Sequence, residues 1–210
     1  MVAGDRTARA DDRSGSHVLH RLRTETAEEH RAVERSLDLL DPALGRARLA
    51  EVLGLLHGFW VAAESGLDAW AVRFPGDAGG VDWGRRRRAA LFDADLSHVG
   101  GTATGDVPHL PHVADTDHAL GRLYVLEGST LGGTFIDRHL ASLPQLSGVR
   151  IRAFSPYGSE TGAMWAAFRR VVRERVAAGG DTEAMIESAR ETFRALAAWC
   201  HPVREPVVPA

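Results

Sequence analysis

Residues 124–140 constrain the fold most strongly, because this segment has the apolar spacing of a helix and yet contains three glycines within six positions. Apolar residues recur at intervals of three and four, which predicts an α-helix with a buried face. Gly128, Gly132 and Gly133 each cost such a helix roughly 1 kcal/mol relative to alanine. Since residues four apart share one face of a helix, Gly128 and Gly132 leave a strip of bare backbone.

Two interpretations explain these glycines. A flat and bulky ligand can lie on the strip that has no side chains. Alternatively, a neighbouring helix crosses closely at the glycines, or Gly128 marks a kink in the helix. The glycines alone do not decide between a binding surface and a packing contact.

A second helical segment, residues 22–37, carries a histidine in the middle of an amphipathic pattern. Thr26, His30 and Glu34 are spaced by four, and Arg23 lies seven positions before His30. Such spacing places all four side chains in one stripe of a helix. A metal-ligating imidazole, a carboxylate to support it and a cation would then share a face. Taken alone, His30 can equally be a surface histidine, and Glu34 a solvated partner of a neighbouring arginine.

Length and composition indicate one globular domain, because the 210 residues are 44% apolar and 25% charged. The formal net charge of -3 argues against general nucleic-acid binding, which depends on clustered positive charge. Four consecutive arginines, residues 85–88, are the exception. We interpret them as the solvated start of a helix because apolar residues follow, with a patch for an acidic partner protein as the alternative.

The single cysteine, Cys200, excludes an intrachain disulfide framework and any thiolate metal cluster within one chain. That usage fits a reducing cytoplasm. No stretch approaches about 20 uninterrupted apolar residues, and the N-terminus lacks the apolar core of a secretory signal. We therefore predict a cytoplasmic protein without a membrane anchor, with a disordered leader at 1–15, a helical domain at 16–202 and a tail at 203–210.

The hydrophobic periodicity predicts helices over 16–40, 43–73, 82–99, 116–142, 159–178 and 182–200. Residues 74–80 and 101–115 are rich in glycine and proline and are predicted to be loops. Strand-like alternation is absent from the sequence. The predicted fold is therefore all-α, a single-domain helical bundle.

Three further histidines need separate treatment. His109 and His112 lie in a loop with prolines, where metal binding is the less favoured interpretation. His139 lies seven residues after Gly132 and shares its helical face, but two turns separate them by about 10 Å along the axis. That distance is too great for coordination of a metal held over the glycines.

Three blocks in this order resemble the soluble bacterial heme oxygenases, particularly those associated with bacteriophytochromes. They are LRTETAEEHRAVE from Leu22, YVLEGSTLGG from Tyr124 and AFSPYGSETGAMWAAF from Ala153. The resemblance covers roughly residues 19–175. It implies a bundle in which heme is sandwiched between a proximal helix with an axial histidine and a kinked distal helix with glycines.

The resemblance also implies roles for individual residues. His30 matches the axial iron ligand, and Glu34 matches the carboxylate that accepts from its second ring nitrogen. Thr26 matches a position that caps, packs or contacts the porphyrin edge. Arg23 matches an anchor for the heme propionates, and Arg169 and Arg173 lie where the family again uses basic residues, although both can equally be solvent-exposed.

On the distal side, Gly128, Ser129, Gly132 and Gly133 match the positions that contact heme and admit oxygen. Some relatives carry an aspartate where Ser129 stands, and that aspartate organises water beside the bound oxygen. A serine can hold such a water without charge. This departure puts the proton-delivery network in doubt, but not the heme site.

The activity that the resemblance implies is oxygen-dependent cleavage of heme b, which serves as both substrate and cofactor. Opening at the α meso position would give biliverdin, carbon monoxide and ferrous iron. Dioxygen and an external electron donor, ferredoxin or another reductase, are then required, and a bacteriophytochrome is the expected acceptor of biliverdin. The alternative is a non-catalytic heme-binding or heme-carrier protein on the same fold.

Overall fold

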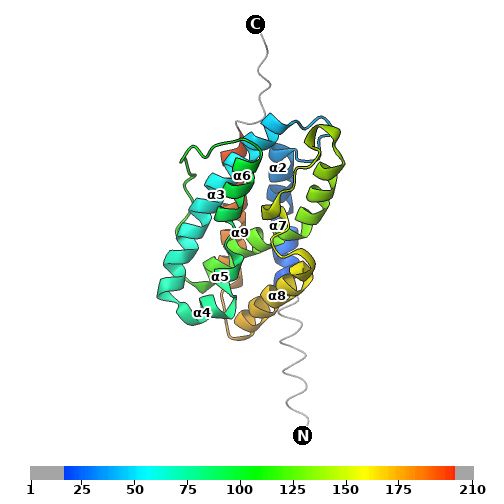
Figure 1. Cartoon of the computed structure of the whole chain (residues 1–210). Coiled ribbons are helices and arrows are strands. Elements are labelled where there is room, and N and C mark those ends of the chain that lie inside the picture. The colour runs from blue at the N-terminus through cyan, green and yellow to red at the C-terminus, as the bar shows by residue number, and fades with distance from the viewer. Residues whose placement is uncertain (1–16, 202–210) are drawn as a thin grey trace.

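The structure is a computed structural model that describes residues 17–201. The predicted leader, residues 1–15, and the predicted tail, residues 203–210, lie outside these residues. Residues 17–201 form helices and connecting segments without a β-strand, as Figure 1 shows. The prediction of an all-α fold is confirmed.

The first predicted helix is divided at Thr26. Residues 17–25 are helical, and α2, Ala27–Leu37, follows after Thr26 adopts φ -108° and ψ 6°. The Thr26 hydroxyl donates to the Leu22 carbonyl at 2.6 Å, a local bond that competes with regular helix geometry. At the other end, Asp38 adopts the left-handed conformation with φ 47°, so α2 stops before Leu40.

The longest helix is α3, Arg46–Arg73, which buries a wide apolar face that includes Trp60 and Trp70. It begins three residues later than predicted. The Asp41 carboxylate accepts from the backbone N–H of Ala43 at 2.8 Å, which makes a local turn there instead of a helix cap.

Three short helices follow where the sequence predicted a loop and one continuous helix. They are α4, Pro75–Gly80, α5, Trp83–Arg86, and α6, Ala89–His98. Pro75 occupies the first turn of α4, where its missing N–H costs nothing. Asp82 then takes a left-handed conformation with φ 53°, and the buried Trp83 donates from Nε1 to Asp68 at 2.8 Å. This tertiary contact favours helical structure in a segment whose composition predicts a loop.

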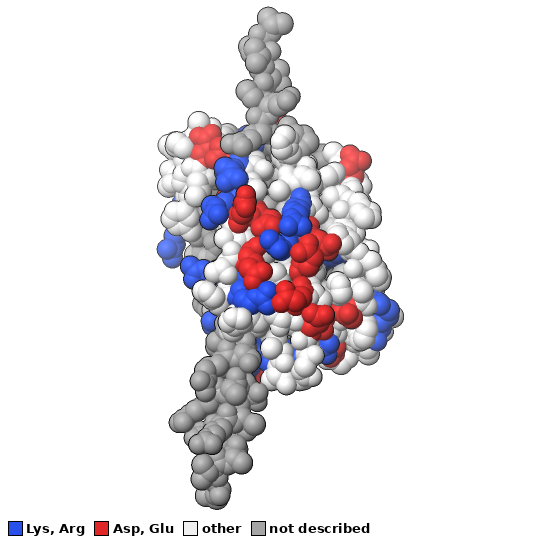
Figure 2. Space-filling view, turned by 180° about the vertical axis from the view of Figure 1, so that it is seen from behind, with Lys and Arg blue, Asp and Glu red and all other residues white. Residues whose placement is uncertain are grey.

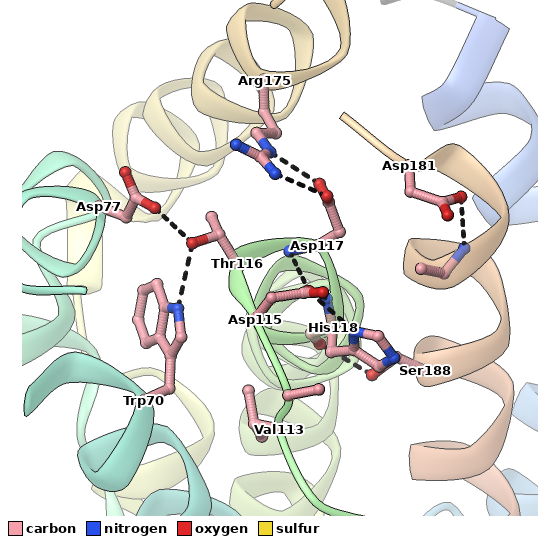
Figure 3. Close-up of polar contacts among 12 residues, drawn as sticks. Trp70, Asp77, Val113, Asp115, Thr116, Asp117, His118, Arg175, Asp181 and Ser188 are labelled. Atoms are coloured by element: carbon pink, nitrogen blue, oxygen red, sulfur yellow. Dashed lines mark hydrogen bonds and ion pairs between the residues drawn. The ribbon is translucent and has the colours of Figure 1, made fainter. Parts of the chain in front are cut away.

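The glycine-bearing helix is α7, Thr116–Ser142, with the predicted bounds. The Asp115 carboxylate caps it by accepting from the backbone N–H groups of Asp117 at 2.9 Å and His118 at 3.0 Å, as Figure 3 shows. Three 3-10 turns come next: η1, Pro144–Leu146; η2, Arg152–Phe154; and η3, Gly158–Glu160.

The last two helices are α8, Thr161–Ala177, and α9, Thr182–Cys200. Asp181 caps α9 as predicted, accepting from the Ala184 backbone N–H at 3.0 Å. In contrast, the Ser159 cap predicted for α8 lies within η3, and Glu160 is the residue that precedes the helix.

Helix α9 lies behind the other helices in the view of Figure 1 and packs against α2, α3 and α7. Its close contact with α7 depends on Gly121, where a Cβ would overlap the Met185 carbonyl. Beside this crossing, the Ser188 hydroxyl donates to the His118 carbonyl at 2.8 Å. Trp199 near the other end of α9 donates to the Leu55 carbonyl of α3 at 2.8 Å.

Acidic and basic side chains lie side by side on the face of the molecule shown in Figure 2. Two ion pairs join α9 to the helices at the start of the described chain. Arg21 of residues 17–25 pairs with Glu183, and Glu29 of α2 pairs with Arg194 at 3.2 Å. Charges of both signs therefore alternate on this face. Among residues 17–201, no helix is long and apolar enough to cross a membrane.

Candidate functional site

The His30 imidazole projects from α2 and is accessible, since 53% of its side chain is exposed. The imidazole and the Phe193 ring of α9 make a T-shaped contact, with a centroid distance of 5.5 Å and an interplanar angle of 88°. Glu34 lies one turn further along α2, with an oxygen 3.6 Å from Nδ1. The structure thus brings His30 and Glu34 together, although 3.6 Å is too long for a hydrogen bond.

Thr26 is buried one turn before His30, and its hydroxyl is bonded to the Leu22 carbonyl. Its role is therefore packing and local hydrogen bonding in this structure. Tyr124 of α7 lies beside it. Burial raises the pKa of the Tyr124 phenol, while the charge of Arg23 and the Thr26 hydroxyl act in the opposite direction. Tyr124 also contacts the Trp165 ring of α8 at 5.9 Å, so it links both helices to the His30 segment.

The glycines of α7 separate into two kinds. A Cβ added to Gly128 or Gly132 would meet no atom within 4 Å, so both face open space. At Gly133 a Cβ would overlap the Phe154 carbonyl of η2. The missing side chain of Gly133 thus admits a neighbouring backbone, so on this side Gly133 faces η2 and not the open strip. Gly128 and Gly132 retain the bare strip that the sequence predicted.

Ser129 is exposed beside this strip, and its hydroxyl is held on two sides. It donates to the Leu126 carbonyl at 2.7 Å and accepts from Arg88 Nη2 at 2.9 Å. Its only proton is thus engaged by the backbone. The remaining lone pair could accept a hydrogen bond from a water molecule at the strip.

Arg88 was not recognised from the sequence as part of this site. Only 2% of the residue is exposed, and its guanidinium lies 3.8 Å from the centroid of the Trp60 ring. It also donates from Nη1 to the Ala153 carbonyl at 3.1 Å. From α3, the Glu64 carboxylate accepts from the backbone N–H groups of Arg88 and, at 2.7 Å, of Ala89. Burial raises the pKa of Glu64, and these backbone bonds oppose the shift.

A second buried cation, Arg86, pairs with Glu127, the residue before Gly128. The Tyr157 hydroxyl donates to the same carboxylate at 2.8 Å. Burial and the charge of Glu127 raise the pKa of Tyr157. The interpretation of residues 85–88 as a solvated helix start is therefore wrong for Arg86 and Arg88, because the two alternate arginines point inward to partners on other elements.

Arg169 and Arg173, four apart on α8, are partly buried, and the Nε atom of each is buried without a hydrogen-bond partner. Within residues 17–201, neither forms an ion pair with a carboxylate. Their charge is therefore available to an anion. His139 also has a buried Nε2 without a partner.

These features fit heme better than a bare metal ion. In the described part of the chain, no group of three or more histidine, cysteine or acidic residues could hold a metal ion. A metal bound to His30 would therefore need most of its ligands from elsewhere, and a porphyrin supplies four nitrogens. The open strip at Gly128 and Gly132 offers a surface without side chains to such a flat ring.

Comparisons with known proteins identify a similar sequence and a similar solved structure. No protein-family model matches the chain. A heme oxygenase from Xanthomonas campestris pv. campestris (strain 8004) is 29% identical over 156 residues, which are 72% of this chain and 90% of that protein. This likeness supports membership of the heme oxygenase family.

The fold is also that of a solved structure. The NO- and CO-bound heme oxygenase from Neisseria meningitidis superposes with a TM-score of 0.71 and 22% identity, covering 92% of this chain and 94% of that one. The chain thus has the heme oxygenase fold.

Proposed function

We propose that this protein is a heme oxygenase, which cleaves heme with dioxygen to biliverdin, carbon monoxide and ferrous iron. The observation that carries the proposal is the open, side-chain-free strip at Gly128 and Gly132, on a chain of heme oxygenase fold with an exposed His30. The likeness to the Xanthomonas heme oxygenase supports it independently.

In the proposed complex, His30 would hold the heme through its iron. The contact with Phe193 restricts the rotation of the ring, and Glu34 is close enough to accept from Nδ1 after a small movement. A histidine ligand is commonly oriented by such a second-nitrogen partner. Bound heme would supply an iron that activates dioxygen, and the same molecule is the substrate whose ring is opened.

The polar residues of the chain would place the ring and the water beside it. Arg23, Arg169 and Arg173 are the proposed anchors for the two propionates, because charge-assisted bonds from arginine to carboxylate give orientation as well as affinity. Ser129, fixed by Arg88 and the Leu126 carbonyl, would accept a hydrogen bond from a water on the distal side. That water would carry the protons which the reaction consumes.

We further propose opening at the α meso position, reduction by ferredoxin or another reductase, a cytoplasmic location and a bacteriophytochrome as the acceptor of biliverdin. The resemblance of the three sequence blocks supports these finer assignments. The catalytic domain is proposed to span residues 16–202, between a leader and a tail.

The direct test is turnover of the heme-loaded protein with ascorbate, or with ferredoxin and its reductase. We expect the Soret absorption of heme to disappear and the spectrum of biliverdin to appear, with release of carbon monoxide. Chromatography of the pigment identifies the isomer. If the Soret band stays intact after many reducing equivalents have been added, the result would instead support the alternative, a heme carrier on the same fold.

Replacing His30 with alanine tests the proximal ligand. We expect turnover to fall by more than about tenfold, because the iron loses its protein ligand. Added imidazole should restore part of the axial absorption spectrum. His20→Ala, on an exposed histidine of the preceding helical segment, is the control and should behave as the parent. Unchanged turnover in His30→Ala would refute this ligand assignment.

Replacing Gly132 with valine tests the distal strip. Its methyl groups would occupy the space in which the ring is proposed to lie, so we expect heme affinity to fall by about tenfold or more. Gly54→Val is the matched control, since Gly54 is also a helical glycine at which an added Cβ would meet no atom within 4 Å. Equal heme uptake by both variants would contradict the distal assignment.

A further inference from the structure

A separate pocket of about 460 Å³ lies between α3 and the loop that leads into α7. Val61 and Ala62 of α3 line one side, and residues 107–113 line the other. Neither Gly128 nor Gly132 lines it. The pocket is therefore distinct from the proposed heme surface, and its walls are mostly aliphatic.

Arg122 is the charged residue of this pocket, and only 2% of it is exposed. Its Nη2 donates to the Pro111 carbonyl, whereas its Nε is buried without a hydrogen-bond partner. Gly66 of α3 makes room for the guanidinium, because a Cβ at that position would overlap Nη1. A helical glycine that costs stability thus accommodates a buried cation.

No carboxylate within the described residues forms an ion pair with Arg122. Burial lowers the pKa of this guanidinium to about 10, and the charge of Glu191 on α9 opposes that shift from a distance. A buried cation without a paired anion is unfavourable, because transfer from water is not compensated. An anion in the pocket would supply the missing partner.

The opposite wall has a repeat of three residues: Val107-Pro108-His109, then Leu110-Pro111-His112, then Val113. No helix or strand is assigned to this segment, and its prolines favour an extended left-handed helix with three residues per turn. In that conformation the aliphatic residues share one edge and the two histidines another. The wall therefore combines an apolar surface with two imidazoles.

The loop is fixed at the end where it enters α7. Arg73 donates from Nη1 to the Ala114 carbonyl at 2.8 Å and from Nη2 to the Val113 carbonyl. Thr116, the next anchor, accepts from Trp70 Nε1 at 3.2 Å and donates to Asp77, as Figure 3 shows. These bonds hold the α7 end of the pocket wall against α3.

From these observations we infer that the pocket binds a small organic carboxylate with an apolar body, held by Arg122 between α3 and residues 107–113. The planar guanidinium matches a carboxylate in shape and charge. The aliphatic walls match the body of the ligand. His109 and His112 stand beside it as polar contacts, in place of the metal site that the sequence left as the less favoured interpretation.

Benzoate is a suitable probe, with benzyl alcohol as its uncharged counterpart and inorganic phosphate as an anion without an apolar body. The full-length protein, labelled with ¹⁵N, is titrated with each while amide shifts are followed. We expect saturable shifts at Gly66, His109 and Arg122 with benzoate, with a dissociation constant on the order of 1 mM. Benzyl alcohol and phosphate should each bind at least about tenfold more weakly, since benzyl alcohol lacks the charge that pairs with Arg122 and phosphate lacks the apolar body.

Two variants locate the binding. Arg122→Met removes the charge, and Ala62→Trp fills the pocket from its α3 side without altering the buried arginine. Each should weaken benzoate binding by about tenfold or more. Arg46→Met, at an exposed arginine at the start of α3, is the control and should bind as the parent does. If Arg122→Met does not fold, the benzoate affinity of Ala62→Trp alone decides whether the ligand binds in this pocket.

Several results would overturn the inference. They are the absence of saturable shifts with benzoate, equal affinity for benzyl alcohol or phosphate, and unchanged affinity in Ala62→Trp. Shifts confined to the residues around His30 and Gly132 would place the ligand at the heme surface and would overturn it as well. Heme turnover is a separate readout, so failure here leaves the proposed oxygenase activity untouched.

Discussion

Gly121, Gly128 and Gly132 lie on one stripe of α7, seven and four residues apart, and yet their surroundings differ. Gly121 is covered by the Met185 carbonyl of α9, so its missing side chain serves helix packing. Gly128 and Gly132, two and three turns further along, meet open space. One stripe therefore contains both of the uses that glycine has in helices: close approach of a neighbour at one end and an uncovered surface at the other.

Gly133 belongs with Gly121, because the Phe154 carbonyl covers it. The comparison shows that adjacent glycines in one sequence motif, Gly132 and Gly133, have different physical roles. Packing against η2 requires a glycine at position 133, whereas no contact of the fold requires one at position 132. Substitutions that separate folding from binding at these positions can test the distinction.

The largest expected effect lies on the covered side of α7, at the buried pair of Arg86 and Glu127. Replacing Arg86 with methionine leaves the carboxylate buried with Tyr157 as its partner, and we expect a loss of about 3–5 kcal/mol in the free energy of unfolding. Urea denaturation followed by circular dichroism measures it. Arg85→Met is the control: its pair with Glu160 is half exposed, so the loss should stay below about 1 kcal/mol. Equal losses would show that burial does not distinguish the two arginines.

An intermediate effect is expected for Gly133→Ala. The added methyl group would overlap a backbone carbonyl that cannot rotate away, so η2 must shift, at a cost of about 1–3 kcal/mol. Thermal and urea unfolding of the heme-free protein are the measurements. If this variant proves as stable as the parent, the contact between α7 and η2 does not depend on glycine.

The smallest effect, and one of opposite sign, is expected for Gly132→Ala. Alanine favours the helix and meets no atom, so the free energy of unfolding should rise by up to about 1 kcal/mol. Under the proposed function, its methyl group would also weaken heme binding in a separate titration. A loss of stability comparable with that of Gly133→Ala would remove the distinction between open and covered glycines.

Much of the fold followed from periodicity, since α3, α7, α8 and α9 carry long and regular apolar patterns. The short helices α4 and α5 were not predicted, because Pro75 and the glycine-rich composition of this segment are typical of a loop. The contact between Trp83 and Asp68 is a tertiary contact that the local sequence does not reveal. The break at Thr26 depends on one side-chain bond to the preceding turn. Local sequence does not specify such contacts.

The placement of candidate residues was predictable where it depends on position along one helix: His30 and Glu34 lie one turn apart on α2, and Gly128 and Gly132 share an open face of α7. It was not predictable where partners are distant in sequence. Arg88 reaches Ser129 across 41 residues, and a run of four arginines gives no sign that alternate members are buried.

The two uncovered glycines have a consequence for the thermostability of the chain. Each lowers the stability of α7, and no neighbouring atom in the fold gains from the absent side chain. A sequence shaped for thermostability alone would have replaced both with alanine. Gly54 of α3 is uncovered in the same way, so an open helical glycine suggests a docking surface on α7 only in combination with the exposed His30.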